Sequence, residues 1–313
     1  MSTYHNFHDL VYHYYRRVFF IFVPGICNAK CSYCYIKPEY SNHAILNDPM
    51  IGRMEEFVNK AKHLGFDEFR ITGGEPLLFE NISDLLTIFK NNNVSYTLLS
   101  NGMDIHKHLE LFENNRPKKI TISYHSKEYH NSIFGVPYKT DLLDENIRFL
   151  CEKKIDLTVS ILLLENNQSG IPHHVLHLKS LGVNSIKLIY PNNEKTKMNL
   201  KNEFVRTVDL LASIPGINVR YSDLNSRTCS MVGRGFLSFS ASQNKVYACC
   251  NSILNENFTS DIDPLNNLTD TLWNFYNAAQ VLKGFPCENH VDFCPIALND
   301  VPVPINTHPL TTP

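Results

Sequence analysis

Short apolar stretches alternate along this chain with longer segments in which apolar residues recur every three or four positions. The strand-like stretches lie at residues 18–23, 68–72, 94–100, 119–123, 155–163 and 184–190, and helical segments lie between them at 48–64, 81–89, 104–113, 141–152 and 172–181. Strands that alternate with helices form parallel sheets, because each helix carries the chain back to the start of the next strand. Right-handed crossovers in succession curl such a sheet into a barrel. The pattern therefore predicts an α/β fold, a partial (β/α)6 TIM-type barrel with its functional residues on the loops that follow the strands.

The alternation of strands and helices stops after Pro215-Gly216, following one more predicted helix at 199–213. Beyond it, residues 236–240 and 245–249 are predicted to pair as a hairpin, and 268–283 to form a helix. We therefore expect four parts: an N-terminal extension at 1–17, the partial barrel at 18–216, a small cysteine-rich domain at 217–295 and a proline-rich tail at 296–313.

Charge and hydropathy argue against nucleic acid and membrane partners. The net charge is -2 and no long basic run occurs, whereas nucleic-acid-binding domains carry a basic patch. No apolar run reaches the roughly 18 residues of a membrane helix. Arg16-Arg17 before an apolar run imitates an export signal, but only six apolar residues precede Pro24, fewer than a signal core contains. The nine cysteines are clustered, which indicates metal binding in a reducing compartment, so we expect a cytoplasmic protein.

Three cysteines follow the first predicted strand within eight residues. Cys27, Cys31 and Cys34 are separated by three and two residues, on the loop that leaves residues 18–23. Three thiolates on one loop can hold three corners of an iron–sulfur cube and leave the fourth iron open to a small molecule. The spacing alone also allows part of a zinc site or disulfide partners.

The residues around these cysteines favour the iron–sulfur alternative. Tyr35 follows the third cysteine, and Gly73-Gly74-Glu75-Pro76 follows the second predicted strand. Together the two motifs resemble the signature of the radical S-adenosylmethionine (radical SAM) enzymes. The resemblance implies that Cys27, Cys31 and Cys34 bind a [4Fe–4S] cluster whose open iron binds S-adenosylmethionine. It also implies cofactor-binding roles for Tyr35 near the adenine, for Gly73, Gly74 and Glu75 beside the methionine amino group, and for Asn101, Ser123 and Ser160 near the ribose and carboxylate.

A second group of cysteines lies in the last 85 residues and includes Cys229, Cys249, Cys250, Cys287 and Cys294. This region resembles the C-terminal extension called SPASM or, in its smaller form, Twitch. The resemblance implies that Cys229, Cys249, Cys287 and Cys294 bind an auxiliary [4Fe–4S] cluster. Asn244 stands where that pattern has a glycine, which a left-handed turn tolerates. A structural zinc site on the same thiols is the alternative.

The expected reaction begins with cleavage of S-adenosylmethionine to a 5′-deoxyadenosyl radical, which abstracts hydrogen from a substrate carbon. A reductant such as flavodoxin or ferredoxin would supply the electron. We expect oxidation of a sugar-like small molecule or a peptide to follow, with the auxiliary cluster as electron acceptor. The alternatives are an epimerase in which Cys250 returns a hydrogen atom, and a ribosomal-peptide maturase. A redox-sensing iron–sulfur or zinc protein without catalytic activity is the alternative of a different class.

Three histidines share the helical segment at 172–181, namely His173, His174 and His177. Residues four apart lie on one face of a helix and can bind a metal ion together. No carboxylate or thiol partner is evident in the sequence, so a solvated face is the prediction.

Overall fold

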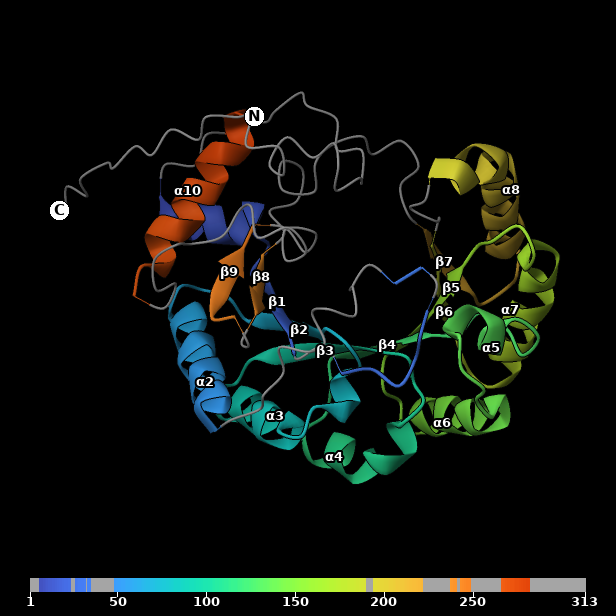
Figure 1. The fold of residues 1–313 in the computed structure, drawn as a ribbon, viewed down its shortest axis with the longest axis horizontal. Helices are drawn as coiled ribbons and strands as arrows, with labels where there is room; N and C mark the ends of the chain where they lie inside the picture. Colours follow the sequence, from blue (N-terminus) through green and yellow to red (C-terminus); the bar gives the residue numbers. More distant parts are fainter. Residues whose placement is uncertain are drawn as a thin grey trace.

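A computed structural model describes residues 6–23, 26–31, 33–34, 48–189, 194–221, 237–240, 243–248 and 266–281. Nine strands of this described chain form a single sheet in the order β7-β6-β5-β4-β3-β2-β1-β8-β9. Their bounds are β1 Val18–Phe22, β2 Glu68–Thr72, β3 Ser95–Ser100, β4 Lys119–Ser123, β5 Leu157–Leu162, β6 Ser185–Ile189, β7 Asn218–Tyr221, β8 Ser238–Ser240 and β9 Lys245–Tyr247. Figure 1 shows the strands as an open, curved arc, so the predicted partial barrel is confirmed.

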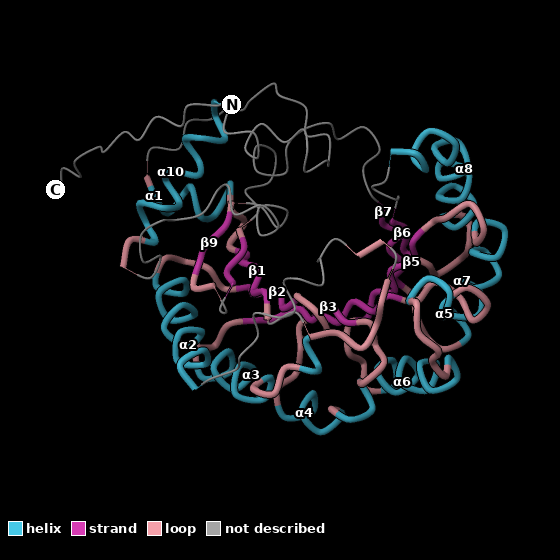
Figure 2. The backbone as a smooth tube through the Cα atoms, viewed as in Figure 1, coloured by secondary structure: helices cyan, strands magenta, loops and turns pink. Residues whose placement is uncertain are grey.

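Helices cover the convex side of this arc (Figures 1 and 2). They are α2 Asp48–His63, α3 Ile82–Asn91, α4 Leu109–Asn114, α5 His130–Phe134, α6 Thr140–Glu152, α7 Ile171–Ser180 and α8 Glu194–Ala212. Every neighbouring strand pair from β7 to β8 is parallel. This is the arrangement that βα units with right-handed crossovers produce.

The two faces of the sheet differ in polarity because successive side chains of a strand point to opposite sides. The convex face carries the apolar residues that pack beneath the helices, among them Phe19, Ile71, Leu98, Ile122 and Val159. The concave face is largely polar: the register aligns Thr121 with Thr158, and Ser123 with Ser160 and Lys187. The core therefore lies between sheet and helices, and the concave face is left for chemistry.

The C-terminal elements extend the same sheet. β8 pairs with β1 in parallel, with Phe20 opposite Ser238, and β9 returns antiparallel beside it. Asn244 in the turn has a φ of 52°, the left-handed conformation predicted for it. Because β7 and β8 both join the sheet, the sheet continues past the predicted boundary at residue 216, and the separate C-terminal domain stays a prediction.

The N-terminal helical turns pack on the last described helix. They comprise α1 at Phe7–Asp9 and the π-helix at Leu10–Tyr14, and they meet α10 at Leu268–Val281. The Tyr15 hydroxyl donates to the Leu272 carbonyl at 2.5 Å, and the Tyr14 and Tyr276 rings meet edge-to-face at 5.1 Å. These contacts join residues more than 250 positions apart, so both ends of the described chain belong to one core.

One predicted helix is broken. The sequence predicts a continuous helix over 104–113, whereas the structure has a 3-10 turn at Ile105–Lys107 and then α4 from Leu109. His108 lies between them with φ -124° and ψ 17°, outside the helical region. Its amide donates to the Ile105 carbonyl at 2.9 Å and closes the 3-10 turn, so the predicted helix is interrupted at this residue.

Candidate active site

The loop after β1 carries three free thiols. Cys27 and Cys34 are exposed and Cys31 is half-buried. The Cys34 amide donates to the Cys31 carbonyl at 3.1 Å, and the Ala29 amide points at the Cys27 sulfur at 3.4 Å. Burial, together with the smaller effect of the neighbouring thiols Cys34 and Cys27, raises the pKa of Cys31 to about 11. The sulfurs are therefore close enough to influence one another.

Short contacts with α5 fix the position of this thiol loop. The Lys30 amide donates to the Phe134 carbonyl at 2.7 Å. Gly135, which ends α5 with φ 68°, lies so close to the loop that a Cβ there would collide with the Lys30 carbonyl. The Cys31 side chain packs against the apolar cluster of Met103, Ile133 and Phe134. Helix α5 thus serves as the support of the thiol loop.

The structure shows why a glycine is needed in the Gly73-Gly74 pair, a reason that the sequence did not reveal. Gly73 has φ 139°, and a Cβ there would collide with the Val23 carbonyl of the strand next to it. The close contact at Gly73 is thus made by the Val23 backbone of the same chain. The Glu75 amide then donates to the Ile26 carbonyl at 2.7 Å. The loops after β1 and β2 are therefore bonded to each other, as the barrel prediction requires.

The Glu75 side chain connects the loop after β2 to the end of β3. Its carboxyl group is buried and accepts from the Leu77 amide at 3.1 Å, the Ser100 hydroxyl at 2.7 Å and the Asn101 amide at 2.7 Å. Burial raises the pKa of Glu75 to about 7, against these three donors, which lower it. The Glu75 side chain thus holds the loop after β2 and the end of β3 together through buried hydrogen bonds.

Asn101 faces the thiol loop, as its place at the end of β3 predicts. Its side-chain amide donates to the Asn28 side-chain oxygen at 2.7 Å and lies 4.0 Å from the Cys27 sulfur. Asn28 in turn donates to the Asp104 carboxylate at 2.7 Å. Asn28 and Asp104 were missed in the sequence, although Asn28 sits between two of the predicted ligands.

The other predicted residues divide into two groups. Ser123 and Ser160 are register partners on the concave face, and Ser160 is buried whereas Ser123 is half-buried. Their predicted cofactor contacts stay predictions. Outside the described residues lie Tyr35, Cys229, Cys249, Cys250, Cys287 and Cys294.

Two further residues meet at this site. The Tyr33 hydroxyl lies 2.8 Å from Nε2 of His125, across 92 positions of sequence, and the rings are perpendicular with centroids 5.5 Å apart. Burial lowers the pKa of His125 to about 3, so the imidazole is neutral at physiological pH. His125 lies two residues after β4 ends at Ser123, and a polar residue just after a barrel strand is itself a sign of a functional position.

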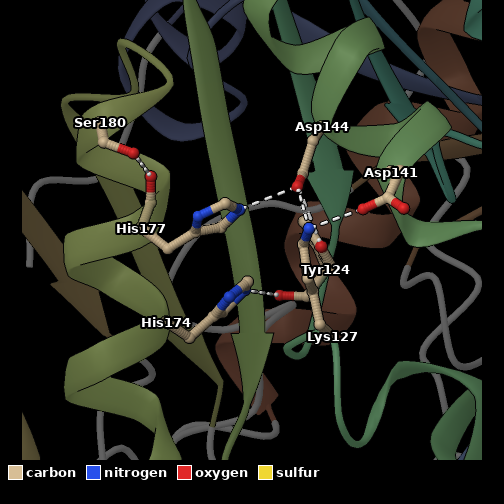
Figure 3. Close-up of polar contacts among 7 residues, drawn as sticks. All are labelled: Tyr124, Lys127, Asp141, Asp144, His174, His177 and Ser180. Atoms are coloured by element: carbon tan, nitrogen blue, oxygen red, sulfur yellow. Dashed lines mark hydrogen bonds and ion pairs between the residues drawn. The ribbon is translucent and has the colours of Figure 1, made fainter.

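A polar network on the convex side holds the end of β4 (Figure 3). Asp144 of α6 accepts from the Tyr124 hydroxyl at 3.0 Å, from His177 at 2.9 Å and from Lys127 at 2.9 Å. His174 Nε2 bonds the Tyr124 carbonyl at 3.2 Å. The prediction of a solvated histidine face is thus wrong for His174, which is buried and bonds the Tyr124 carbonyl, and for His177, which bonds the Asp144 carboxylate of α6. Only His173 of the three is exposed.

A family model for the radical SAM superfamily matches residues 21–178, just over half of the chain. This segment contains the thiol loop, Gly73-Gly74-Glu75 and Asn101. The chain belongs to the radical SAM superfamily. Membership implies S-adenosylmethionine and a [4Fe–4S] cluster as cofactors.

Curated relatives match over parts of their length. A probable GTP 3′,8-cyclase of Methanococcus maripaludis is 23% identical over 176 residues, which are 53% of this chain and 56% of that protein. The GTP 3′,8-cyclase of Staphylococcus carnosus is 22% identical over 214 residues, 64% of this chain and 63% of that protein. The chain thus spans little more than half the length of the first of these relatives.

Solved structures share the fold. Streptococcus suis SuiB bound to S-adenosylmethionine superposes with a TM-score of 0.69 at 14% identity, over 90% of this chain and 71% of SuiB. The anSMEcpe protein with bound AdoMet and the Kp18Cys peptide superposes with a TM-score of 0.64 at 18% identity, over 84% of this chain and 82% of that one. At these identities the likeness establishes the partial barrel alone.

The donor set of the thiol loop fits a cluster with three protein ligands. Three thiols that are free of disulfides lie on one loop beside the carboxyl ends of β1–β3. Among the described residues no three cysteine, histidine or acidic side chains converge as a metal site. The thiols must therefore turn inward and lose their protons when a cluster binds.

Proposed function

We propose that this radical SAM protein is an enzyme that holds its [4Fe–4S] cluster on Cys27, Cys31 and Cys34. One observation supports the proposal above the others: the thiol loop is bonded to the Gly73-Gly74-Glu75 loop through the Glu75 amide and Ile26 carbonyl. The two parts of the signature therefore meet at the strand ends, where barrels of this kind place their chemistry. When bound, the reduced cluster supplies the electron that cleaves S-adenosylmethionine to methionine and a 5′-deoxyadenosyl radical.

The chain itself positions the participants and excludes water. Gly73 and Gly74 leave backbone groups free of side chains beside the thiol loop. Asn101 directs its amide toward Cys27, and hydrogen bonds to a ligand sulfur stabilise the thiolate. Ser123 and Ser160 offer hydroxyl groups on the concave face beyond them, where we propose that the cofactor ribose and carboxylate bind. Tyr35 is the proposed neighbour of the adenine.

We further propose an auxiliary [4Fe–4S] cluster on Cys229, Cys249, Cys287 and Cys294. The confirmed β8–β9 hairpin and the left-handed Asn244 support it, since the pattern requires a tight turn shortly before Cys249. With such a cluster to accept an electron, the substrate radical ends in a net oxidation. Without it, hydrogen return from Cys250 gives an epimerase.

The proposed substrate is a peptide or a sugar-like small molecule. The solved structures of SuiB with the precursor peptide SuiA and of anSMEcpe with Kp18Cys favour the peptide. The curated GTP 3′,8-cyclases favour a small molecule. The polar concave face, with hydroxyl groups from β4 and β5 beside Lys187 of β6, suits either kind of polar substrate.

Anaerobic reconstitution with dithionite and S-adenosylmethionine tests the proposal, with 5′-deoxyadenosine as the product measured by chromatography. The wild type should form it, and the triple variant Cys27→Ala, Cys31→Ala, Cys34→Ala should form none. Cys151→Ala is the matched control, because Cys151 is a half-buried thiol on α6 that packs against the core. Product from the triple variant would show that the site is elsewhere.

Iron content and the Cys250→Ala variant test the second half of the reaction. Two clusters should give about eight irons per chain, whereas about four irons with one zinc would exclude the auxiliary cluster. In an oxidase the variant should turn over normally. In an epimerase it should still cleave S-adenosylmethionine but fail to deliver the inverted product.

A further inference from the structure

Three residues of the thiol loop are hydrogen-bonded to three different parts of the barrel. The Ile26 carbonyl accepts from the Glu75 amide in the loop after β2 at 2.7 Å, and the Lys30 amide donates to the Phe134 carbonyl of α5 at 2.7 Å. Between them, the side chain of Asn28 is bonded at the carboxyl end of β3. The first two bonds use backbone groups, which nearly every residue provides. Asn28 is therefore the one of these three loop residues whose bonds depend on its side chain.

A backbone donor fixes the orientation of two side-chain amides. The Met103 amide donates to the Asn101 side-chain oxygen at 2.9 Å, and a backbone amide can only donate. The Asn101 side-chain nitrogen therefore faces Asn28 and donates to its side-chain oxygen at 2.7 Å. The Asn28 side-chain nitrogen is then directed at the Asp104 carboxylate, to which it donates at 2.7 Å. Asn28 thus accepts a hydrogen bond on one side and donates one on the other.

The acceptor of this second bond is a buried carboxylate. Asp104 is only 5% exposed, and its Oδ1 pairs with Nζ of Lys107 at 2.5 Å while its Oδ2 accepts from Asn28. A hydrogen bond from an amide to a carboxylate is stronger than one between neutral groups. The end of β3 therefore holds Asn28 by one neutral and one charge-assisted hydrogen bond.

We propose that Asn28 is a positioning residue that holds the stretch between the Cys27 and Cys31 ligands against the end of β3. This role rests on the proposed function, since it takes both cysteines as cluster ligands. It concerns the backbone of the loop, because each thiol can turn about its own Cα–Cβ bond toward a cluster while the bonds of Asn28 and Lys30 stay in place. A loop that is already fixed loses less conformational freedom when the cluster binds. The bonds of Asn28 therefore favour retention of the cluster.

The geometry requires an amide at one of positions 28 and 104 and a carboxylate at the other. In Asn28→Asp two carboxylates face each other, neither can donate, and the like charges repel. In Asp104→Asn the Asn28 nitrogen still meets an oxygen, so the bond is kept without its charge. In the double variant Asn28→Asp, Asp104→Asn the new carboxylate accepts from Asn101 and from the new amide. The exchange of the two side chains thus restores both hydrogen bonds.

Anaerobic release of iron from reconstituted protein to a chelator tests the inference. Asn28→Asp should release iron about tenfold faster than the wild type, the effect of one lost hydrogen bond to a charged group. Asp104→Asn should release it about threefold faster, because only the charge of the bond is lost. The double variant should release iron at the Asp104→Asn rate although it contains the more damaging substitution.

Asn131→Asp is the matched control. Asn131 is an exposed residue of the supporting helix α5, and its side-chain oxygen accepts from the Tyr138 amide at 3.0 Å. The aspartate keeps that acceptor and adds the same charge near the thiol loop. This variant should release iron at the wild-type rate.

Hydrogen exchange of the cluster-free protein gives a second readout that needs no iron. Mass spectrometry of a peptide spanning residues 26–31 follows the Lys30 amide, which is bonded to Phe134. Asn28→Asp should exchange faster than the wild type in this peptide, and the double variant should regain protection. Circular dichroism of each variant checks that the fold is retained.

The outcomes separate this inference from the proposed function. A wild type that holds no cluster would overturn the proposed function and leave the role of Asn28 in the loop to be decided by hydrogen exchange. A wild type that holds the cluster, with equal iron release from Asn28→Asp and Asn131→Asp, would overturn only the inference. A double variant as fast as Asn28→Asp would overturn it as well, since residues 28 and 104 would then act separately.

Discussion

At the scale of single residues, Glu75 holds more parts of the site together by hydrogen bonds than its place in a glycine motif suggests. Its two carboxyl oxygens accept from Leu77, Ser100 and Asn101, and its own amide reaches the thiol loop. One residue, through its side chain and its backbone amide, thus joins the ends of three strands. The motif follows β2 in the sequence, but its carboxyl group accepts hydrogen bonds from residues at the end of β3.

Glu75→Ala should lower the free energy of unfolding of the cluster-free protein by about 3 kcal/mol, since several buried donors lose their acceptor at about 1–3 kcal/mol each. Urea unfolding followed by circular dichroism measures it. Glu80→Ala is the control, because Glu80 is an exposed carboxylate five residues further on. Equal stability of the two variants would show that the three hydrogen bonds contribute nothing.

At the scale of elements, the thiol loop depends on a helix of five residues. Helix α5 ends at Gly135, whose backbone lies directly against Lys30, and the Lys30 amide bonds the last carbonyl of α5. A loop is held best where a rigid element supports it. The site is therefore sensitive to changes in α5 that touch neither thiols nor substrate.

Gly135→Ala should sharply reduce iron incorporation while the fold is retained. The new methyl group displaces the Lys30 carbonyl and with it the loop between Cys27 and Cys31. Gly216→Ala is the matched control, since Gly216 also has a left-handed φ, 75°, but open space around it. Both variants lose about 1 kcal/mol to the backbone conformation, and only Gly135→Ala should lose iron, measured by colorimetric assay after reconstitution.

The elements themselves were largely predictable. β2 and β4 have the bounds that their apolar runs predict, and α2 begins at Asp48, the first residue of the helical segment predicted at 48–64. Contacts between distant segments were not predictable. The parallel pairing of β1 with β8, with Phe20 opposite Ser238, joins segments that lie far apart in the sequence. The same holds for Tyr33 and His125, because a local pattern does not identify partners 92 residues apart.

At the scale of the whole molecule, three histidines are buried behind the end of β4. His125, His130 and His174 lie around Tyr124 and Phe134. Burial lowers the pKa of His125 to about 3 and those of His130 and His174 to about 4. All three are neutral in the folded protein at pH 6, whereas in the unfolded chain they take up protons below about pH 6.5.

The folded cluster-free protein should therefore lose stability steeply between pH 6 and 5. Unfolding takes up three protons on these histidines, which favours the unfolded state as pH falls through the unfolded pKa. Glu75 opposes them with one proton, because its folded pKa is raised to about 7. The net uptake of about two protons on unfolding lowers the free energy of unfolding by about 2.7 kcal/mol for each pH unit of acidification. Urea unfolding at pH 6.0, 5.5 and 5.0 measures this slope.

His130→Phe replaces a histidine whose ring nitrogens find no partner within the described chain. This variant should lower the slope by the contribution of one proton. A slope equal to that of the wild type would show that His130 is not buried in its neutral form.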